Sequence, residues 1–284
     1  MNKMGNESEQ HGILDYACRA IDFLENQSLK ESLRSAFTAG KPSLESVESF
    51  FNLLSAYAWP REALEVVMRS YREEHLTSPF MAALAIRIMR LASASEDARV
   101  AQTLYESSAL VQDTIAEDLG VEEGKLAHTD LFQPLANAVC GDDDWVKDKH
   151  LIAEAREFRE WVRKQRLESP LFDALATTIS SEIFNHGEYS ASLPSWETLL
   201  KARLRMSESQ ADQAILYVRI HTGDTESGHF LCAVQALEKY CTATGEAFDA
   251  ERVGSICAEY IDRASRVFSS LEATLRSYAP GKAA

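Results

Sequence analysis

Histidine and acidic residues gather in one short polar stretch of an otherwise apolar part of the chain. The stretch reads HTGDTESGH from His221 to His229, with apolar residues on both sides. Glu226 and His229 are three positions apart and would share one face of a helix. His221 precedes His229 by eight positions, a little over two turns at about 3.6 residues per turn. These side chains are therefore candidate metal ligands.

Two glycines inside this stretch allow two interpretations. Gly223 and Gly228 would each cost roughly 1 kcal/mol relative to alanine in a helix interior. One interpretation is a continuous helix with a one-residue π-bulge, a feature that recurs at functional sites. The other is a loop between two shorter helices, in which the histidines could still bind a metal.

A single acidic residue interrupts the apolar and small residues that follow Asp173 in the segment from Leu171 to His186. Glu182 lies there beside apolar and small residues. A carboxylate on the buried side of a helix is costly unless it is paired or coordinates a cation. His186 follows four positions later on the same helix face and is a further candidate ligand. The alternative is that Glu182 lies just off the buried face.

A third segment places acids and a histidine on either side of a predicted loop. Glu117 and Asp118 end an amphipathic stretch that breaks at Gly120, and His128 opens the next one. An acid at one helix end and a histidine at the next helix start can face each other. The alternative is that both acids are surface charges and that His128 is a capping or core residue.

Carboxylates and imidazoles from facing helices are the donors of a di-iron site in a helical bundle. A carboxylate can bridge two ions, and a neutral imidazole suits iron. Candidates from three segments would satisfy two metals and leave positions open for dioxygen and a substrate. We expect the remaining histidines, His11, His75 and His150, to face solvent.

The elements that would hold these side chains are helices throughout. Apolar residues recur at spacings of three and four, and no segment shows the period-two alternation of a strand. The polar breaks at 120–125 and 141–144 are short enough to be loops within one bundle, and a helix should begin near Trp145. Five prolines are expected at helix starts or stops: Pro42, Pro60, Pro79, Pro170 and Pro194.

The pattern predicts an all-α, single-domain bundle spanning residues 1–284. Within it, helices of residues 1–95 would pack on a metal-binding helical core of residues 96–284. The five cysteines include no CxxC pair, so free thiols are expected rather than a zinc or disulfide framework.

Charge and hydropathy exclude several kinds of partner. The net charge of −15 argues against binding to a nucleic-acid backbone. No stretch reaches the roughly 18 consecutive apolar residues of a membrane span, and the N-terminus lacks a signal-peptide apolar region. We therefore expect a cytoplasmic protein with a small-molecule substrate and no nucleic-acid or membrane partner.

The order of these motifs resembles the haem-oxygenase-like di-iron oxidases and oxygenases. These enzymes are relatives by fold of the TenA-type thiaminases and the quinone-cofactor synthase. The resemblance covers roughly residues 98–240: an acid-x-Gly helix end, a His followed by Leu and Phe, a lone helical Glu and a His–acid–His cluster. It implies iron ligands at Asp118, His128, Glu182, His221, Glu226 and His229.

The chain departs from the family pattern at two of these positions. The family usually has Glu where Asp118 stands, so neighbouring Glu117 is a rival ligand. Thr225 occupies the usual place of the acid in the last cluster, so Asp224 is a rival of Glu226. A mononuclear site is the alternative to two occupied iron positions.

The resemblance also implies an activity. Two Fe(II) ions would use dioxygen as co-substrate to oxidise a small amino-acid-like or amine substrate, by N-oxygenation, oxidative C–C cleavage or desaturation, in a biosynthetic pathway. Arg219 could pair with a substrate carboxylate, and the family suggests a homodimer. The alternatives are a metal-free enzyme of the TenA or quinone-cofactor-synthase kind and a non-catalytic helical interaction protein.

Overall fold

Helices account for all regular structure in the residues that the computed structural model describes, 11–121 and 126–279, with the side chains of 224–226 left aside. No strand occurs in these ranges, so the all-α prediction is confirmed. The α-helices are α1 (Ile13–Ile21), α2 (Gln27–Ala39), α3 (Lys41–Ala56), α4 (Arg61–His75), α5 (Ser78–Ser93), α6 (Ala98–Asp118), α7 (His128–Cys140), α8 (Ala153–Leu167), α9 (Leu171–Thr198), α10 (Glu208–Ala214), α11 (Leu216–Ile220), α12 (Asp224–Thr244) and α13 (Ala250–Tyr278).

Capping side chains and prolines fix many of the helix starts. Asn26 accepts a hydrogen bond from the Leu29 backbone N–H at the start of α2, and Asp97 caps α6 in the same way. Four of the five prolines expected at helix boundaries lie at a cap or in a first turn: Pro42, Pro60, Pro79 and Pro170. The expectation for Pro194 is wrong, because this proline lies inside α9.

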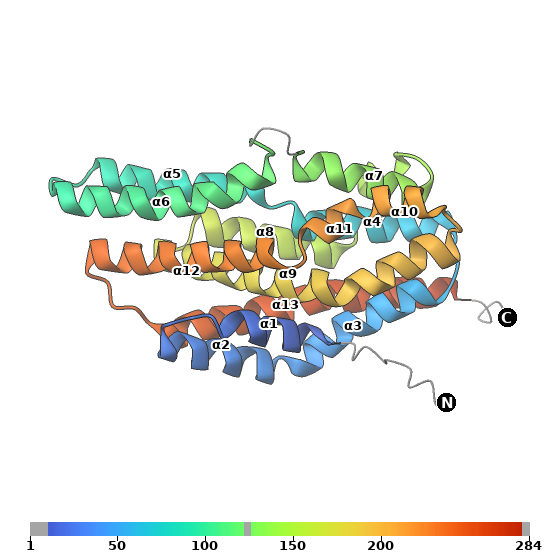
Figure 1. Ribbon diagram of the computed structural model, residues 1–284, viewed down its shortest axis with the longest axis horizontal. Helices are drawn as coiled ribbons and strands as arrows, with labels where there is room; N and C mark the ends of the chain where they lie inside the picture. The colour runs from blue at the N-terminus through green and yellow to red at the C-terminus, as the bar shows by residue number, and fades with distance from the viewer. Residues whose placement is uncertain (1–10, 122–125, 280–284) are drawn as a thin grey trace, which may run out of the picture.

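Helix α9 lies at the centre of the bundle (Figure 1). It contacts α1, α3, α5, α8, α11, α12 and α13. Nearly every residue of α9 from Phe172 to Tyr189 is buried, whichever face it occupies. A helix surrounded in this way must be apolar or must find a partner for each polar group it carries.

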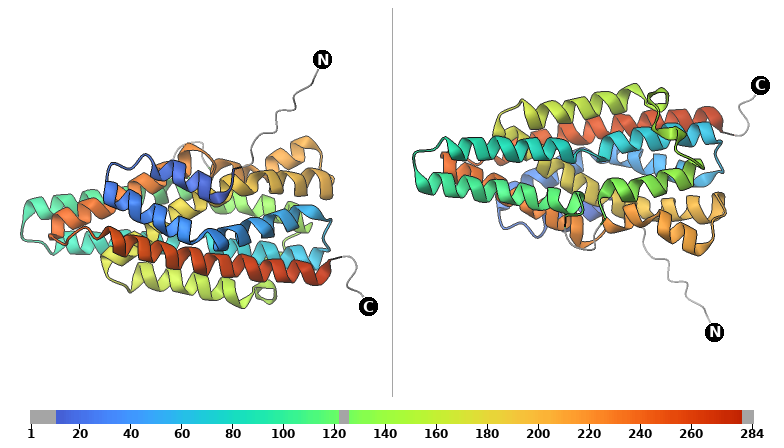
Figure 2. Two further views of the ribbon diagram at one scale, coloured as in Figure 1. Left: turned by 90° about the horizontal axis from the view of Figure 1, so that it is seen from below. Right: turned by 90° about the horizontal axis from the view of Figure 1, so that it is seen from above.

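The other helices cover α9 from opposite sides. The pair α5 and α6 lies on one side, and α2, α3 and α13 lie on the other (Figure 2). Helix α12 packs against both α6 and α9. Because its neighbours come from all parts of the chain, α9 can receive side chains from distant segments.

One predicted helix start is wrong. Two short 3₁₀ turns, Asp144–Val146 and Asp148–His150, occupy the segment where we expected a helix to begin near Trp145, and α8 begins only at Ala153. The buried Trp145 explains the difference. Its indole N–H donates to Asn137 of the preceding helix, which holds the segment against α7.

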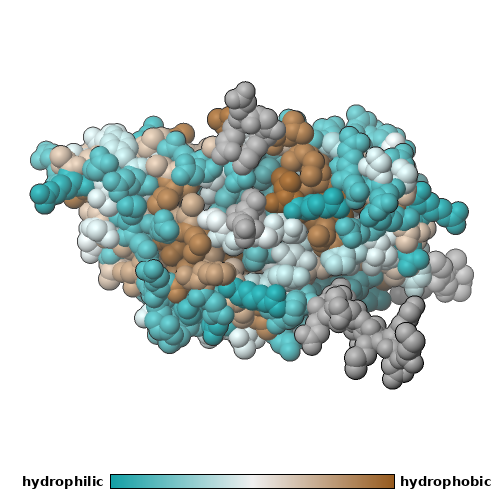
Figure 3. Space-filling model, in the orientation of Figure 1, coloured by the Kyte–Doolittle hydropathy of each residue, from teal (hydrophilic) through white to brown (hydrophobic). Residues whose placement is uncertain are grey.

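The face of the molecule seen in Figure 3 is largely hydrophilic, with hydrophobic patches among the polar residues. Leu119, Val121 and Leu126 are exposed and lie at the two borders of the segment between α6 and α7. None of the helices in the described ranges combines the length and apolar character needed to cross a membrane.

The boundary at residue 95 between N-terminal helices and a metal-binding core stays a prediction.

A close approach between the backbones of α1 and α9 leads to a prediction about the free energy of unfolding. A Cβ atom on Gly187 would lie 2.8 Å from the backbone oxygen of Ile13. We expect Gly187→Ala to lower the free energy of unfolding by ~1–3 kcal/mol, because two backbones must move apart. Chemical denaturation measures the change.

Gly228 in α12 is the matched control. A Cβ atom there would meet nothing within 4 Å. Gly228→Ala should leave stability unchanged or raise it by ~0.5–1 kcal/mol, since alanine is the better helix former. Equal effects of the two substitutions would show that the contact with Ile13 is not tight.

Candidate metal centre

Five of the six predicted ligands lie close together, on α6, α7, α9 and α12 and at the end of α11. Asp118 is the last residue of α6, and His128 is the first residue of α7. His221 caps the C-terminal end of α11, and His229 lies in the second turn of α12. Glu182 projects from the middle of α9.

The polar stretch around His221 is a turn between two helices. Helix α11 ends before His221, and Gly223 adopts a positive φ of 79° at the start of α12. This conformation suits glycine, which has no Cβ to clash. The interpretation as a loop between shorter helices is therefore correct, and the continuous helix with a π-bulge is wrong. The side chains of Asp224 and Glu226 lie outside the described residues.

Five of the predicted ligands and Glu117 form two groups, which we call the first and the second arm of the candidate centre. The first arm joins Asp118, His128 and His221. Asp118 Oδ1 lies 3.0 Å from His128 Nδ1, and His221 Nε2 lies 3.1 Å from the same nitrogen. Ser78 Oγ donates to the other Asp118 oxygen at 2.6 Å. Burial raises the pKa of Asp118, but the hydrogen bonds from His128 and Ser78 outweigh it, and the net shift is downward. Asp118 is therefore held as a carboxylate.

The tautomer of His221 follows from its backbone contact. Its Nδ1 lies 2.5 Å from the carbonyl oxygen of Tyr217. Burial, followed by the neighbouring His128, lowers the pKa of His221 to about 3, so the ring is neutral. The carbonyl can only accept, so Nδ1 carries the proton and Nε2 carries the lone pair. This arrangement is common among metal-binding histidines.

The second arm joins Glu117, His229 and Glu182. His229 Nε2 lies 2.9 Å from Glu117 Oε2, and its Nδ1 lies 3.9 Å from Glu182 Oε2. Burial raises the pKa of Glu182, with His229 and Arg166 opposing the shift. The buried Arg166 donates to Ser181, whose hydroxyl bonds Glu182. Glu117, the rival ligand, therefore lies with His229, and Asp118 lies with His128.

The further candidates differ in their surroundings. His186 is buried, and its Nδ1 has no hydrogen-bond partner in the described part of the chain. The side chain of Arg219 is 40% exposed, and its guanidinium pairs with Asp212 at 3.1 Å and Glu197 at 3.3 Å. Its predicted role in substrate binding stays a prediction.

A cavity of about 170 Å³ lies over the first arm. Asp118 and His128 contribute to its wall, together with Arg72 and Arg159. Arg159 pairs with the buried Glu73, while Arg72 lies 3.8 Å from the same carboxylate. The cavity therefore joins a positively charged rim to the candidate ligands.

A second group could hold a metal ion. Among the described residues, Glu65, Asp144 and His150 form the one set of three such side chains whose donor atoms all lie within 4.8 Å of one another. Arg61 bonds Glu65 at 2.7 Å, and Lys147 pairs with Asp144. Because cations already neutralise both acids, the group is also explained as an ion-pair network.

The structure corrects the expectation for two histidines. His75 and His150 are buried rather than solvent-facing. His75 Nε2 lies 3.5 Å from Glu188 Oε2 on α9 and 4.0 Å from Glu74 Oε2. The sequence offered one signal for these contacts, because Glu188, like Glu182, is an acid in the middle of the long, mostly uncharged segment that forms α9.

Burial shifts the pKa values of Glu74, His75 and Glu188, which form a second cluster beside the candidate centre. Burial, followed by the charge of Glu188, raises the pKa of Glu74 well above its ordinary range. Burial also lowers the pKa of His75 well below its usual value. The ring of Tyr189 lies 4.8 Å from the ring of His75 and 4.4 Å from the ring of His221. One aromatic side chain thus separates the two clusters.

Comparison with known proteins identifies the fold. A crystal structure of a TenA homologue from Pseudomonas syringae pathovar tomato is similar to this chain, with a TM-score of 0.61 over 88% of this chain and 93% of that one. The sequences are 12% identical, so the likeness shows the fold alone. The TenA-type, haem-oxygenase-like helical bundle expected from the sequence is confirmed. No protein-family model matches the chain, and no curated protein matches it.

Glu188 generates a prediction for the pH dependence of stability. Burial raises the pKa of its carboxyl from 4.5 to about 8 against the hydrogen bond from Tyr71. Between these values the folded protein holds a proton that the unfolded chain has lost, so the free energy of unfolding falls as pH rises. The expected slope is up to ~1.4 kcal/mol per pH unit. It disappears above the folded-state pKa.

Urea denaturation of wild type and Glu188→Gln across this window tests the effect. The variant should lack the part of the slope that Glu188 contributes. Glu31→Gln, a substitution of an exposed acid on α2, should keep the wild-type slope. A Glu188→Gln profile parallel to that of wild type would mean that this carboxyl is ionised in the folded protein.

Proposed function

We propose that the chain is a non-haem di-iron oxidase or oxygenase that uses dioxygen to oxidise a small amino-acid-like or amine substrate. The reaction would be an N-oxygenation or an oxidative C–C cleavage. The observation that carries the proposal is the meeting of predicted ligands from distant segments. His229 contacts Glu117 across 112 residues of sequence, and His221 contacts His128 across 93.

The donors suit iron by type and by environment. Asp118, His128 and His221 would serve on one side, and Glu117, Glu182 and His229 on the other. Carboxylates with imidazoles form the donor set of bundle-core di-iron proteins. Bound iron would supply the electrons and the open coordination positions that dioxygen chemistry requires.

The chain's own residues would orient those donors and exclude water. The Tyr217 carbonyl holds Nδ1 of His221, so Nε2 is directed to the cluster. Ser78 fixes one oxygen of Asp118, and the Arg166–Ser181 pair fixes Glu182. Such supporting hydrogen bonds tune both affinity and geometry.

The cavity with Arg72 and Arg159 supports a substrate that carries an anionic group. Glu73 is shared among Arg69, Arg72 and Arg159, and Asp148 also pairs with Arg69, so three guanidinium groups face two carboxylates. Arg72 makes the longest of these contacts, at 3.8 Å. Its guanidinium is therefore the group best placed to bind a carboxylate while the rest of the substrate faces Asp118 and His128.

Iron binding tests the proposal directly. Metal-free protein should take up about two Fe(II) per chain under anaerobic conditions and consume dioxygen afterwards. His128→Ala and His229→Ala should each lower the bound iron, since each removes a donor from a different arm. Iron analysis after gel filtration measures the stoichiometry.

His150→Ala is the control for the Glu65 group, and it should leave the iron count of the proposed centre unchanged. Loss of iron only in His150→Ala would move the metal site to that group and contradict the proposal. Absence of iron uptake by folded protein would favour a metal-free enzyme or a non-catalytic helical protein.

Arg72 gives a prediction for substrate choice. Dioxygen consumption is measured with amino acids and with the corresponding amines that lack the carboxylate. For a carboxylate-bearing substrate, Arg72→Ala should lower kcat/KM at least about tenfold, equivalent to ~1.4 kcal/mol of transition-state binding. Activity toward the matching amine should change little.

Arg219→Ala tests the candidate from the sequence in the same assay. Its side chain is held by Asp212 and Glu197, so we expect a smaller effect than that of Arg72→Ala. A larger effect of Arg219→Ala would return the carboxylate-binding role to Arg219.

A further inference from the structure

A buried polar cluster beside the proposed centre lacks any counter-ion in the described residues. Tyr71, Glu74 and His75 come from the end of α4, and Glu188 comes from α9. The side chains of Glu74, His75 and Glu188 are fully buried. No lysine or arginine in the described ranges forms an ion pair with either carboxylate.

The neighbouring acid on α4 shows how unusual this is. Glu73 is also buried, but Arg69 and Arg159 both bond it. Glu74 points to the other side of the helix, and neither of its oxygens has a hydrogen-bond partner among the described residues. Both ring nitrogens of His75 also lack one there. Buried polar groups are normally satisfied, so this cluster calls for a ligand that donates hydrogen bonds.

The chemistry of the cluster specifies that ligand. Two carboxyl groups and a neutral imidazole converge there, with His75 Nε2 at 3.5 Å from Glu188 and 4.0 Å from Glu74. Burial favours the protonated form of both carboxyls in the free protein, and a bound ammonium group would stabilise their ionised form. An ammonium group carries three donors and a positive charge, and each N–H···O bond spans about 2.9 Å.

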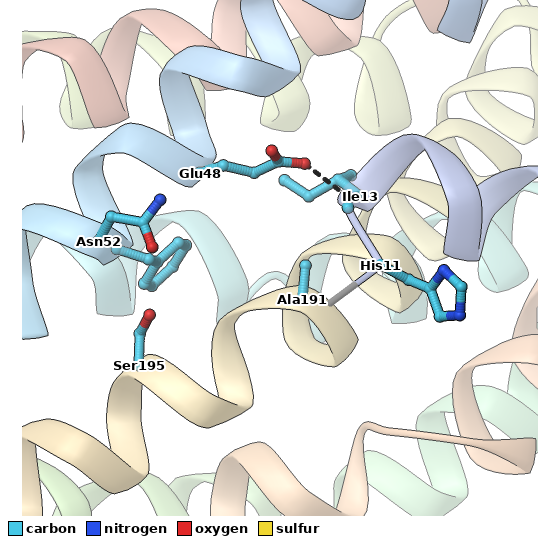
Figure 4. Close-up of a pocket in the computed structure, with 8 residues that line it drawn as sticks. His11, Ile13, Glu48, Asn52, Ala191 and Ser195 are labelled. Atoms are coloured by element: carbon cyan, nitrogen blue, oxygen red, sulfur yellow. Dashed lines mark hydrogen bonds between the residues drawn. The ribbon is translucent and has the colours of Figure 1, made fainter. Parts of the chain in front are cut away.

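A neighbouring cavity provides a place for the rest of such a molecule. The cavity, of about 230 Å³, lies between α3 and α9, and Glu48, Asn52, Ala191 and Ser195 line it (Figure 4). Ala191 and Ser195 follow Glu188 by three and seven positions, so they lie along one face of α9.

An aromatic wall separates the cavity from the cluster. Phe51 lines the cavity, and its ring packs edge-on against Tyr71 at 6.2 Å. The hydroxyl of Tyr71 donates to Glu188 at 3.1 Å. Phe51 and Tyr71 thus lie between the cavity and Glu188.

We propose that Glu74, His75 and Glu188 bind the ammonium group of a small organic amine that enters from the Phe51 cavity. The ring of Tyr189 contacts both His75 and His221, so the bound amine lies next to the candidate iron ligands. Its assignment as the substrate's amine rests on the proposed function. Binding itself requires no metal.

Calorimetric titration of metal-free protein with n-butylamine tests this site. n-Butanol and butyrate serve as neutral and anionic molecules of the same length. Wild type should bind the amine and neither of the other two. Glu74→Gln and Glu188→Gln should each weaken amine binding at least tenfold, and two variants keep the test sound if one fails to fold.

Glu65→Gln is the matched control, because Glu65 is another buried acid of α4 but has Arg61 as a partner. It should bind n-butylamine as wild type does. No binding by wild type, equal binding of n-butanol, or equal weakening in Glu65→Gln would overturn the proposal. Binding of Mn²⁺ by wild type that is lost in Glu74→Gln would also overturn it, because the site would then be a metal site. None of these results depends on iron uptake, so failure here is distinguishable from failure of the proposed function.

Discussion

The burial of carboxylates on α9 is the constraint on which the interior of this protein depends. The helix is enclosed on all sides, yet it carries Glu182 and Glu188 in its central turns. Each buried charge without a partner would cost several kcal/mol, or the group would take up a proton. The groups that surround the two carboxylates differ. Histidine, serine and arginine surround Glu182, whereas tyrosine and a neutral histidine surround Glu188.

Helix ends supply the groups that surround Glu182. Helices α6 and α11 end, and α7 and α12 begin, at or near the residues of the candidate centre. An interrupted helix leaves backbone carbonyls available, and one of them, from Tyr217, fixes the tautomer of His221. Glycines with positive φ at Gly120 and Gly223 permit the breaks. The side chains around Glu182 therefore come largely from the ends of helices.

The acids of α4 illustrate how position within one helix separates structural from functional charge. Glu65 bonds Arg61 of the same helix, and Glu73 bonds Arg69 of the same helix and Arg159 of α8, so both carboxylates are paired without a ligand. Glu74 faces α9 and meets a second acid and a histidine. Adjacent residues with the same side chain thus differ because one side of the helix faces cations and the other faces the core.

The sequence by itself determined the helical class, most helix boundaries and the acid–histidine pair at Asp118 and His128, because caps, glycines and apolar spacing act over a few residues. It also singled out Glu182, since a lone acid in an apolar helix is costly. Only the tertiary structure decided that Glu117 lies with His229, and that His75 is buried beside Glu188 rather than exposed. The Tyr71–Glu188 contact spans 117 residues, and which buried faces meet over such a distance depends on the packing of the whole bundle.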